Sequence, residues 1–242
     1  MEINNKKIEN GELSKLIDNR IKNLFESKQG SFIQEKFSKY MDEPSDINEL
    51  LIYLYEYSFC FSKIVEFGTR SGISTISFIR SLLIASSTKI EDIDEHNNLI
   101  YKNKNTFLTT YDINKHPNID EIERELEGNE FVDFKFIQAN VLNIEIEETD
   151  ILFIDTYHTA SQLEKELSLH SKKVKHRIIL HDTTTFWETG EQPYPGLDHI
   201  GLSCGRGLKY AVEPFLENNP EWKVIFRTEK NNGLMVLERN TI

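Results

Sequence analysis

The chain has 242 residues, of which 38% are hydrophobic, and it carries a formal net charge of −12 from 28 basic and 40 acidic residues. This length fits one α/β domain with an appendage better than two full domains. The acidic balance argues against nucleic acid as the main partner, because binding to a phosphate backbone depends on clustered Lys and Arg.

The N-terminal part is predicted to be helical and contains no glycine-rich loop. Apolar residues recur at helical spacing between Leu13 and Phe25, which is typical of an amphipathic helix. A break at Pro44 then separates an N-terminal helical extension, residues 1–45, from the main domain, residues 46–242. The extension is a candidate for covering an active site or for joining the subunits of a homo-oligomer.

Strand and helix patterns alternate through the main domain. Strands are predicted at residues 63–67, 106–112, 131–138, 150–155, 177–181, 222–227 and 234–238, helices at residues 73–85, 118–128, 160–171 and 208–217, and loops at residues 86–105, with a short helix, and 186–207. Five strands with helical connections predict a mostly parallel sheet, and the Asn231-Asn232-Gly233 turn predicts an antiparallel hairpin at the C-terminus. The predicted fold is therefore α/β, with a Rossmann-like, doubly wound, mostly parallel seven-stranded sheet. Ligands are expected at the carboxyl ends of its strands.

The segment from Val65 to Thr75 contains the most informative motif of the chain. It follows a short β-branched pair and precedes an apolar helical pattern, which predicts a strand, a glycine turn and a helix. Such an arrangement brings backbone N–H groups and a helix N-terminus to a ligand. Glu66 lies just before the glycines and no Lys follows them. A carboxylate there repels a pyrophosphate, so we predict a nucleoside ligand with a positively charged tail.

Polar residues follow the next two predicted strands. Asp112 ends the second strand, where an acid can accept hydrogen bonds from both ribose hydroxyls. It lies 112 − 68 = 44 residues after Gly68, whereas about 20 residues separate the two in a dinucleotide-binding unit. A long connection must therefore loop out, or Asp112 serves only as a turn residue. Asn140 follows the third strand and suits the hydrogen-bonding edge of an adenine.

The fourth and fifth predicted strands each end in a carboxylate, Asp155 and Asp182. Two carboxylates at one sheet edge repel each other unless a cation or a proton lies between them. This pair suits Mg²⁺, and either His158 or His181 as a further ligand would move the preference toward Mn, Fe or Zn. In the alternative interpretation, Asp155 caps the following helix and His181 is a buried, satisfied histidine.

These motifs together resemble the class I S-adenosylmethionine-dependent methyltransferases over roughly residues 46–240. The resemblance rests on the segment from Glu66 to Gly72 and on Asp112. Within that class, the segments Ile154–His158 and His181–Thr183 are similar to the small-molecule O-methyltransferases of the catechol, cephalosporin-hydroxylase-like and macrocin types. In those enzymes the acids after the fourth and fifth strands hold a divalent metal that binds the substrate hydroxyl.

The resemblance implies S-adenosylmethionine as the cofactor and O-methylation of a small molecule or sugar as the reaction. It assigns cofactor binding to Glu66, Gly68, Thr69, Ser71, Gly72, Ser74, Asp112 and Asn140, and metal binding to Asp155, His181 and Asp182. His158 lies three positions after Asp155, where the catechol-type enzymes place a catalytic Lys, so His158 and Asp155 are the implied catalytic residues. The chain departs from these relatives beside Asp182, because they offer Glu or Asn where it has His181 and Thr183.

Besides another reaction on the same fold, such as a hydroxylation, two other functions remain open from the sequence. One is an NAD-type oxidoreductase on a similar sheet, which the position of Glu66 disfavours. The other is a non-catalytic protein of this fold that binds the nucleoside for regulation.

The expected location is the cytoplasm. Cys60 and Cys204 are far apart and have no metal-like spacing, which fits a reducing compartment. The polar N-terminal segment lacks the apolar core of a signal peptide. No apolar run approaches the ~18 residues that a membrane-spanning helix needs, so no membrane partner is expected.

Overall fold

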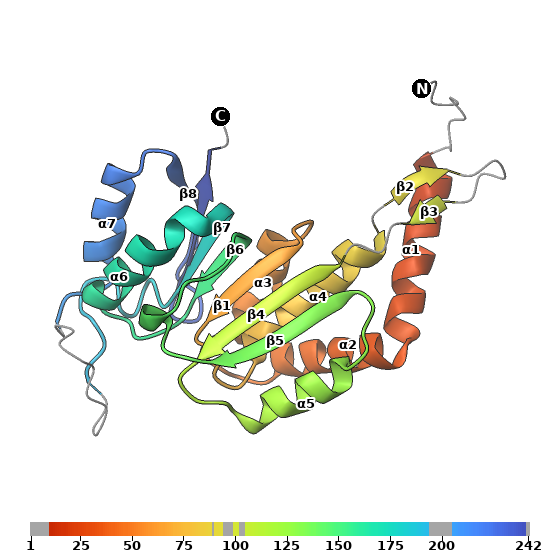
Figure 1. Ribbon diagram of the computed structural model, residues 1–242, viewed down its shortest axis with the longest axis horizontal. Helices are drawn as coiled ribbons and strands as arrows, with labels where there is room; N and C mark the ends of the chain where they lie inside the picture. The colour runs from red at the N-terminus through yellow and green to blue at the C-terminus, as the bar shows by residue number, and fades with distance from the viewer. Residues whose placement is uncertain (1–9, 89, 94–98, 102–104, 194–204, 241–242) are drawn as a thin grey trace.

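A seven-stranded sheet forms the centre of the protein (Figure 1). The computed structural model describes residues 10–88, 90–93, 99–101, 105–193 and 205–240. The strands of the sheet are β1 (Lys63–Phe67), β4 (Thr106–Asp112), β5 (Val132–Gln138), β6 (Thr149–Ile154), β7 (Val174–His181), β8 (Trp222–Thr228) and β9 (Leu234–Arg239). They lie in the order β5-β4-β1-β6-β7-β9-β8. The first five of this order run parallel, while β9 pairs antiparallel with β7 and β8. The predicted fold class is therefore confirmed.

Helices cover both faces of the sheet (Figure 1). They are α1 (Asn10–Glu26), α2 (Lys28–Asp42), α3 (Leu51–Ser58), α4 (Ile73–Thr88), α5 (Pro117–Leu126), α6 (Ala160–His170) and α7 (Lys209–Asn218), with short 3₁₀ helices η1 (Asn48–Leu50), η2 (Val141–Asn143) and η3 (Ser171–Lys173). Side chains alternate along each strand, so Ile64 packs in the core beneath α2 to α5, and Val65 packs in the core beneath α6 and α7.

The N-terminal helices share the core of the sheet domain. Ile33 of α2 is fully buried in the same cluster as α4 and the sheet. The guanidinium of Arg80, on α4, lies over the rings of Phe25, Phe37 and Tyr55 at 5.4, 4.7 and 4.6 Å from their centroids. Because such contacts attract a cation to each ring face, Arg80 joins α1, α2 and α3 to the main domain.

The region predicted as a loop with a short helix, residues 86–105, differs from that prediction. Helix α4 continues to Thr88, and β2 (Ile90–Ile93) pairs antiparallel with β3 (Leu99–Tyr101) outside the main sheet. These strands contain only four and three residues, too few for an alternating pattern to reveal them. Part of this region lies outside the described residues.

The strand order places the expected ligand position at the carboxyl end of β1. The chain leaves β1 toward β4 on one side, and β6 lies on its other side. At such a reversal the connections diverge and leave space beyond the strand ends. The loops after β1, β4, β5, β6 and β7 therefore meet there. Among the described residues, no helix has both the length and the apolar character needed to cross a membrane.

Candidate active site

The glycine loop after β1 abuts the end of β6. Gly68 has a φ of +84°, and a Cβ there would lie 1.8 Å from the carbonyl oxygen of Asp155. The Gly68 N–H donates to the Tyr111 carbonyl at 2.9 Å, and the Asp155 N–H donates to the Phe67 carbonyl at 2.9 Å. Only glycine fits this position, because any side chain would collide with the backbone of β6. The loop therefore lies in direct contact with the Asp155 segment.

Glu66 ties β1 to the start of α4. Its side chain is fully buried, and it accepts hydrogen bonds from the hydroxyls of Ser74, at 2.5 Å, and Thr75, at 2.7 Å. Burial raises the pKa of the Glu66 carboxyl to about 8, although both hydroxyl contacts oppose that rise. Glu66 and Ser74, two predicted cofactor contacts, thus bond to each other beneath the loop rather than at its exposed edge.

This buried acid makes the stability of the protein depend on pH. A Glu in the unfolded chain has a pKa of 4.5, whereas the pKa of Glu66 in the folded protein is about 8. The folded state therefore binds the proton more tightly than the unfolded state does. The resulting stabilisation is complete below pH 4.5 and is lost as the pH rises through about 8. The Glu66→Gln variant resembles the protonated acid. Between pH 4.5 and about 8, we expect its free energy of unfolding to fall by on the order of 2–4 kcal/mol less than that of the wild type.

The measurement is urea unfolding of both proteins from pH 5 to pH 9. Glu166 contributes a decline in the same direction, since burial raises its pKa to about 7, but that decline is common to both proteins. The exposed Glu147, changed to Gln, is the control and should leave the slope unaltered. Equal pH slopes for the wild type and Glu66→Gln would contradict the prediction.

Asp112 and Asn140 lie at the neighbouring strand ends. The Asp112 carboxylate accepts hydrogen bonds from the N–H of Arg70 at 2.7 Å and of Asn114 at 3.1 Å. It therefore has the turn role considered above, and it also contacts the glycine loop. Asn140 accepts a hydrogen bond from the Leu142 N–H at 2.9 Å.

The other predicted loop residues make local contacts. Thr69 is buried and donates to the Tyr111 carbonyl at 3.3 Å. The Ser71 carbonyl accepts a hydrogen bond from the Asn118 amide at 3.2 Å. Gly72 has a φ of +80° and starts the turn into α4.

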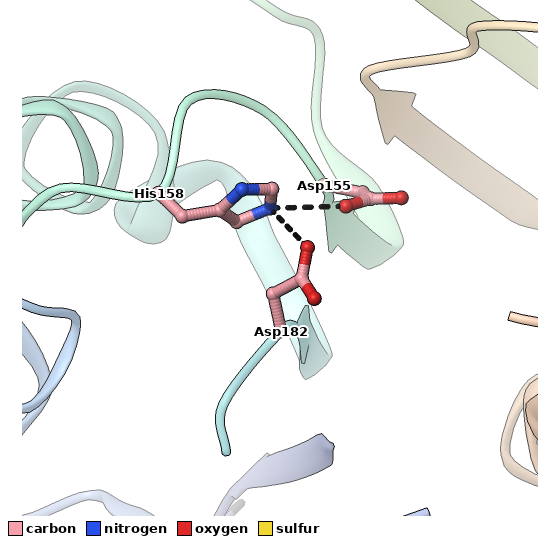
Figure 2. A group of neighbouring side chains, drawn as sticks. All are labelled: Asp155, His158 and Asp182. Carbon is pink, nitrogen blue, oxygen red and sulfur yellow. Dashed lines mark hydrogen bonds and ion pairs between the residues drawn. The ribbon is translucent and has the colours of Figure 1, made fainter. Parts of the chain in front are cut away.

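The predicted metal and catalytic residues come together after β6 and β7. They are Asp155, His158, His181 and Asp182. Figure 2 shows one nitrogen of the His158 ring facing both Asp155, at the end of β6, and Asp182, just after β7. Its Nε2 lies 3.1 Å from Asp155 Oδ1 and 2.9 Å from Asp182 Oδ2. On the other side of the ring, Nδ1 lies 2.9 Å from Glu191 Oε2. Three carboxylates thus surround one imidazole.

The charge of this cluster bears on the predicted base, His158. Burial lowers the pKa of His158, but hydrogen bonds to Asp155, Asp182 and Glu191 outweigh burial and hold the pKa well above 6.5. In this state the ring is an imidazolium that donates from both nitrogens. A general base needs a pKa near the working pH and an open nitrogen, which this ring lacks. To bind a metal through Nε2, the ring must first give up the proton on that nitrogen, because a histidine ligand is neutral.

His181 has different surroundings from those of a ligand. Its Nε2 donates to the carbonyls of Asp46, at 3.2 Å, and Asn231, at 3.1 Å. Its Nδ1 lies 3.0 Å from Asp155 Oδ1. Burial lowers the pKa of His181, but the charge of Asp155 raises it to about 9 overall. Since carbonyl oxygens occupy its outer nitrogen, His181 supports Asp155 from behind rather than joining the set of converging ligand atoms.

Asp155, His158 and Asp182 fit a divalent metal. One potential ligand atom from each lies within 4.8 Å of the others. Asp182 has a φ of +58°, a backbone conformation that non-glycine residues seldom adopt. Its Oδ1 is buried and has no hydrogen-bond partner among the described residues. An unsatisfied buried carboxylate oxygen is costly, and a cation between these three side chains would satisfy it.

Two contributors to the site were missed by sequence reasoning. Glu191 contacts His158 from the segment after β7, and the Asp46 carboxylate receives the Arg70 guanidinium at 2.6 Å across the glycine loop. Glu191 lies in a predicted loop without periodicity, and Asp46 follows the Pro44 break as an ordinary turn residue would. Neither position carried a local signal for its role.

Known proteins resemble the chain in structure rather than in sequence. No protein-family model matches it, and no curated protein matches it significantly. The structure of a candidate O-methyltransferase from Klebsiella pneumoniae aligns with a TM-score of 0.51 at 16% identity, covering 96% of this chain and 99% of that chain.

Two further structures match less closely. A Podospora anserina methyltransferase with bound S-adenosylhomocysteine has a TM-score of 0.48 at 14% identity, covering 99% of this chain and 100% of that chain. The 1,6-didemethyltoxoflavin-N1-methyltransferase of Burkholderia thailandensis, with bound 1,6-didemethyltoxoflavin and S-adenosylhomocysteine, has a TM-score of 0.49 at 12% identity, covering 88% of this chain and 87% of that chain.

At these identities the likeness establishes the fold. The Klebsiella protein matches over nearly the whole of both chains. The chain has a Rossmann-like methyltransferase fold, with the mostly parallel seven-stranded sheet and the antiparallel C-terminal hairpin that the sequence predicted. A fold alone does not assign a reaction, so the function must come from the site.

Proposed function

We propose that this protein is an S-adenosylmethionine-dependent methyltransferase that methylates a hydroxyl of a small molecule or sugar with the help of a divalent metal. One observation carries the proposal: the glycine loop touches the backbone of Asp155, whose side chain belongs to the candidate metal cluster. A cofactor cradle and a metal-binding cluster therefore adjoin at one sheet edge. Such contiguity is what a transfer from cofactor to metal-bound acceptor requires, because the two reactants must meet in a fixed orientation.

The cofactor side of the proposal rests on charge and on the loop. The backbone from Gly68 to Gly72 would receive the amino acid part of the cofactor, Asp112 the ribose hydroxyls and Asn140 the adenine. No Lys follows the glycines, and Asp112 and Asp155 face the same edge, so the edge is negative. A sulfonium cation is favoured there over a pyrophosphate.

The acceptor side rests on Asp155, His158 and Asp182. In this proposal His158 is a metal ligand rather than the base, and His181 positions Asp155. Bound by these residues, a divalent cation would lower the pKa of an acceptor hydroxyl. The residues themselves hold the acceptor near the cofactor and balance the charge that develops on its oxygen. The methyl donor is already activated, so positioning and electrostatics are the chief contributions of the protein.

Calorimetric titration with S-adenosylhomocysteine and with NAD⁺ tests the cofactor assignment. We expect saturable binding of S-adenosylhomocysteine and no heat from NAD⁺. The reverse result would favour an oxidoreductase and overturn the proposal. Exhaustive chelation tests the metal: methyl transfer to acceptors that carry vicinal hydroxyls should stop and should return with added metal. A protein that binds the nucleoside but methylates no hydroxyl compound would support the regulatory alternative.

Replacing Asp112 by Ala should weaken S-adenosylhomocysteine binding about 10–100-fold, since hydrogen bonds to a charged group are worth about 1.5–3 kcal/mol and about 1.4 kcal/mol is tenfold in affinity. Asp133, an exposed acid on the neighbouring strand β5, changed to Ala is the matched control and should bind as the wild type does. Unchanged affinity in Asp112→Ala would remove Asp112 from the cofactor site.

A further inference from the structure

We propose that Glu191 is a positioning residue that holds the His158 ring with Nε2 toward Asp155 and Asp182, and thereby makes the site select a metal that accepts a nitrogen ligand over Mg²⁺. This inference rests on the proposed metal at Asp155, His158 and Asp182. It adds a residue from a different segment of the chain and a preference among metals.

Four contacts join Glu191 to the turn that carries His158. Two come from the main chain of Glu191: its N–H donates to the His158 carbonyl at 2.9 Å, and its carbonyl accepts from the Tyr157 hydroxyl at 3.1 Å. Two come from its carboxylate: Oε2 accepts from the His158 backbone N–H at 3.2 Å and lies 2.9 Å from Nδ1. The carboxylate therefore fixes both the ring and the backbone that bears it.

The carboxylate contact determines which ring nitrogen is left for a metal. An ionised carboxylate only accepts hydrogen bonds, so Nδ1 must carry the hydrogen and Nε2 must point to the two aspartates. The ring also stacks on Phe186, with centroids 5.0 Å apart and planes at 5°, which opposes tilting. In metal sites, a carboxylate that receives the other ring N–H of a histidine ligand fixes its orientation and raises its basicity.

The segment that carries Glu191 is itself anchored. A Cβ on Gly190 would lie 2.6 Å from the carbonyl oxygen of Arg206, so two stretches of backbone pass close together there. The Gly207 N–H donates to the Glu188 carbonyl at 3.1 Å. This packing places the carboxylate of Glu191 before a metal arrives, and a ligand held in advance binds with less loss of conformational freedom.

The metal preference follows from the donor set. Two carboxylates alone suit Mg²⁺, whereas an imidazole nitrogen held in the same cluster suits Mn²⁺, Fe²⁺, Co²⁺ or Zn²⁺ better. Without Glu191 the ring is free to turn its nitrogen away, and the site approaches the two-carboxylate case. Glu191 should therefore affect a nitrogen-preferring metal more than it affects Mg²⁺.

The experiment titrates the full-length protein with Co²⁺ and with Mg²⁺ by calorimetry and records the visible absorption of the Co²⁺ form. The variants are Glu191→Ala and the isosteric Glu191→Gln, which leave both main-chain contacts in place. Glu188→Gln is the matched control, because Glu188 lies on the same segment but is largely exposed and pairs with Lys209. S-adenosylhomocysteine affinity is measured for every variant.

We expect the wild type to bind Co²⁺ more tightly than Mg²⁺. Glu191→Ala should weaken Co²⁺ binding about 10–100-fold and shift its absorption band, with a smaller loss in Glu191→Gln and none in Glu188→Gln. S-adenosylhomocysteine should bind equally well to all four proteins.

Wild-type affinity and spectrum in Glu191→Ala would overturn the positioning role, and an equal loss of Co²⁺ and Mg²⁺ affinity in Glu191→Ala would overturn the selectivity. A wild type that binds neither metal overturns the inference, while S-adenosylhomocysteine binding still supports the cofactor assignment. Loss of S-adenosylhomocysteine binding in Glu191→Ala but not in Glu191→Gln would indicate a folding defect, and the Co²⁺ affinity of Glu191→Gln would then decide.

Discussion

Gly68→Ala should destabilise the protein by more than about 4 kcal/mol, a range reached by few single substitutions. A Cβ at this position would lie 1.8 Å from the carbonyl oxygen of Asp155 and 2.6 Å from its carbonyl carbon. Both atoms belong to backbone at the end of β6, so no side-chain rotation can relieve the contact. Relief requires β1 and β6 to separate at the centre of the sheet, where the backbone N–H of Asp155 donates a hydrogen bond to the Phe67 carbonyl.

Two other glycines separate this effect from backbone strain. Gly128 has a φ of +71°, and a Cβ there would meet nothing within 4 Å, so Gly128→Ala tests the left-handed conformation alone and should cost about 1–2 kcal/mol. At Gly72, with a φ of +80°, a Cβ would meet Ile119 Cδ1 at 2.9 Å and Ile122 Cδ1 at 3.0 Å. Those side chains can shift, so Gly72→Ala should fall between the other two.

Urea unfolding of the three variants measures this order, with S-adenosylhomocysteine titration of those that fold. Gly128→Ala should bind the nucleoside normally, because Gly128 follows α5 at the opposite end of the sheet. A Gly68→Ala protein no less stable than Gly128→Ala would show that the loop does not need its close approach to β6. The proposed link between the cofactor loop and Asp155 would then fail.

The fold was largely predictable because its strands are strongly patterned. The apolar run of β6 ends just before Asp155, and that of β7 ends at His181. The sequence alone therefore predicted that these residues lie at one edge of the sheet. Gly128 and the Asn231-Asn232-Gly233 turn, all at positive φ, marked a helix end and a hairpin by the conformations that they allow. The short strands β2 and β3 lacked such a pattern.

The detail of the candidate site was less predictable because it depends on long-range contacts. Glu191 meets His158 across 33 positions, and the Asp46 carbonyl meets His181 across 135. The resemblance implied metal binding by Asp155, His181 and Asp182 and a catalytic role for His158. Asp182 Oδ2 lies 2.9 Å from His158 Nε2 and 3.6 Å from His181 Nδ1, and its backbone is left-handed. A single sequence does not reveal such a conformation at an Asp.

Asp182→Asn should weaken metal binding by at least about 1,000-fold, beyond the 10–100-fold expected for residues that only orient a ligand. The substitution removes the negative charge of one of the three converging groups and leaves its shape. Asn also tolerates the left-handed backbone conformation that Asp182 adopts, with a φ of +58°. The variant should therefore fold normally, and the loss should reflect the carboxylate itself.

Calorimetry with Co²⁺ measures the loss, and S-adenosylhomocysteine titration tests the cofactor side, which should be unaffected because the glycine loop follows a different strand. Asp120, an exposed acid in the first turn of α5, changed to Asn is the matched control. Asp182 Oδ1 has no partner among the described residues, and a cation ligand is the physical reason proposed for that buried oxygen. If Asp182→Asn bound Co²⁺ as tightly as the wild type, Asp182 would not be a metal ligand, and its buried oxygen would need another explanation.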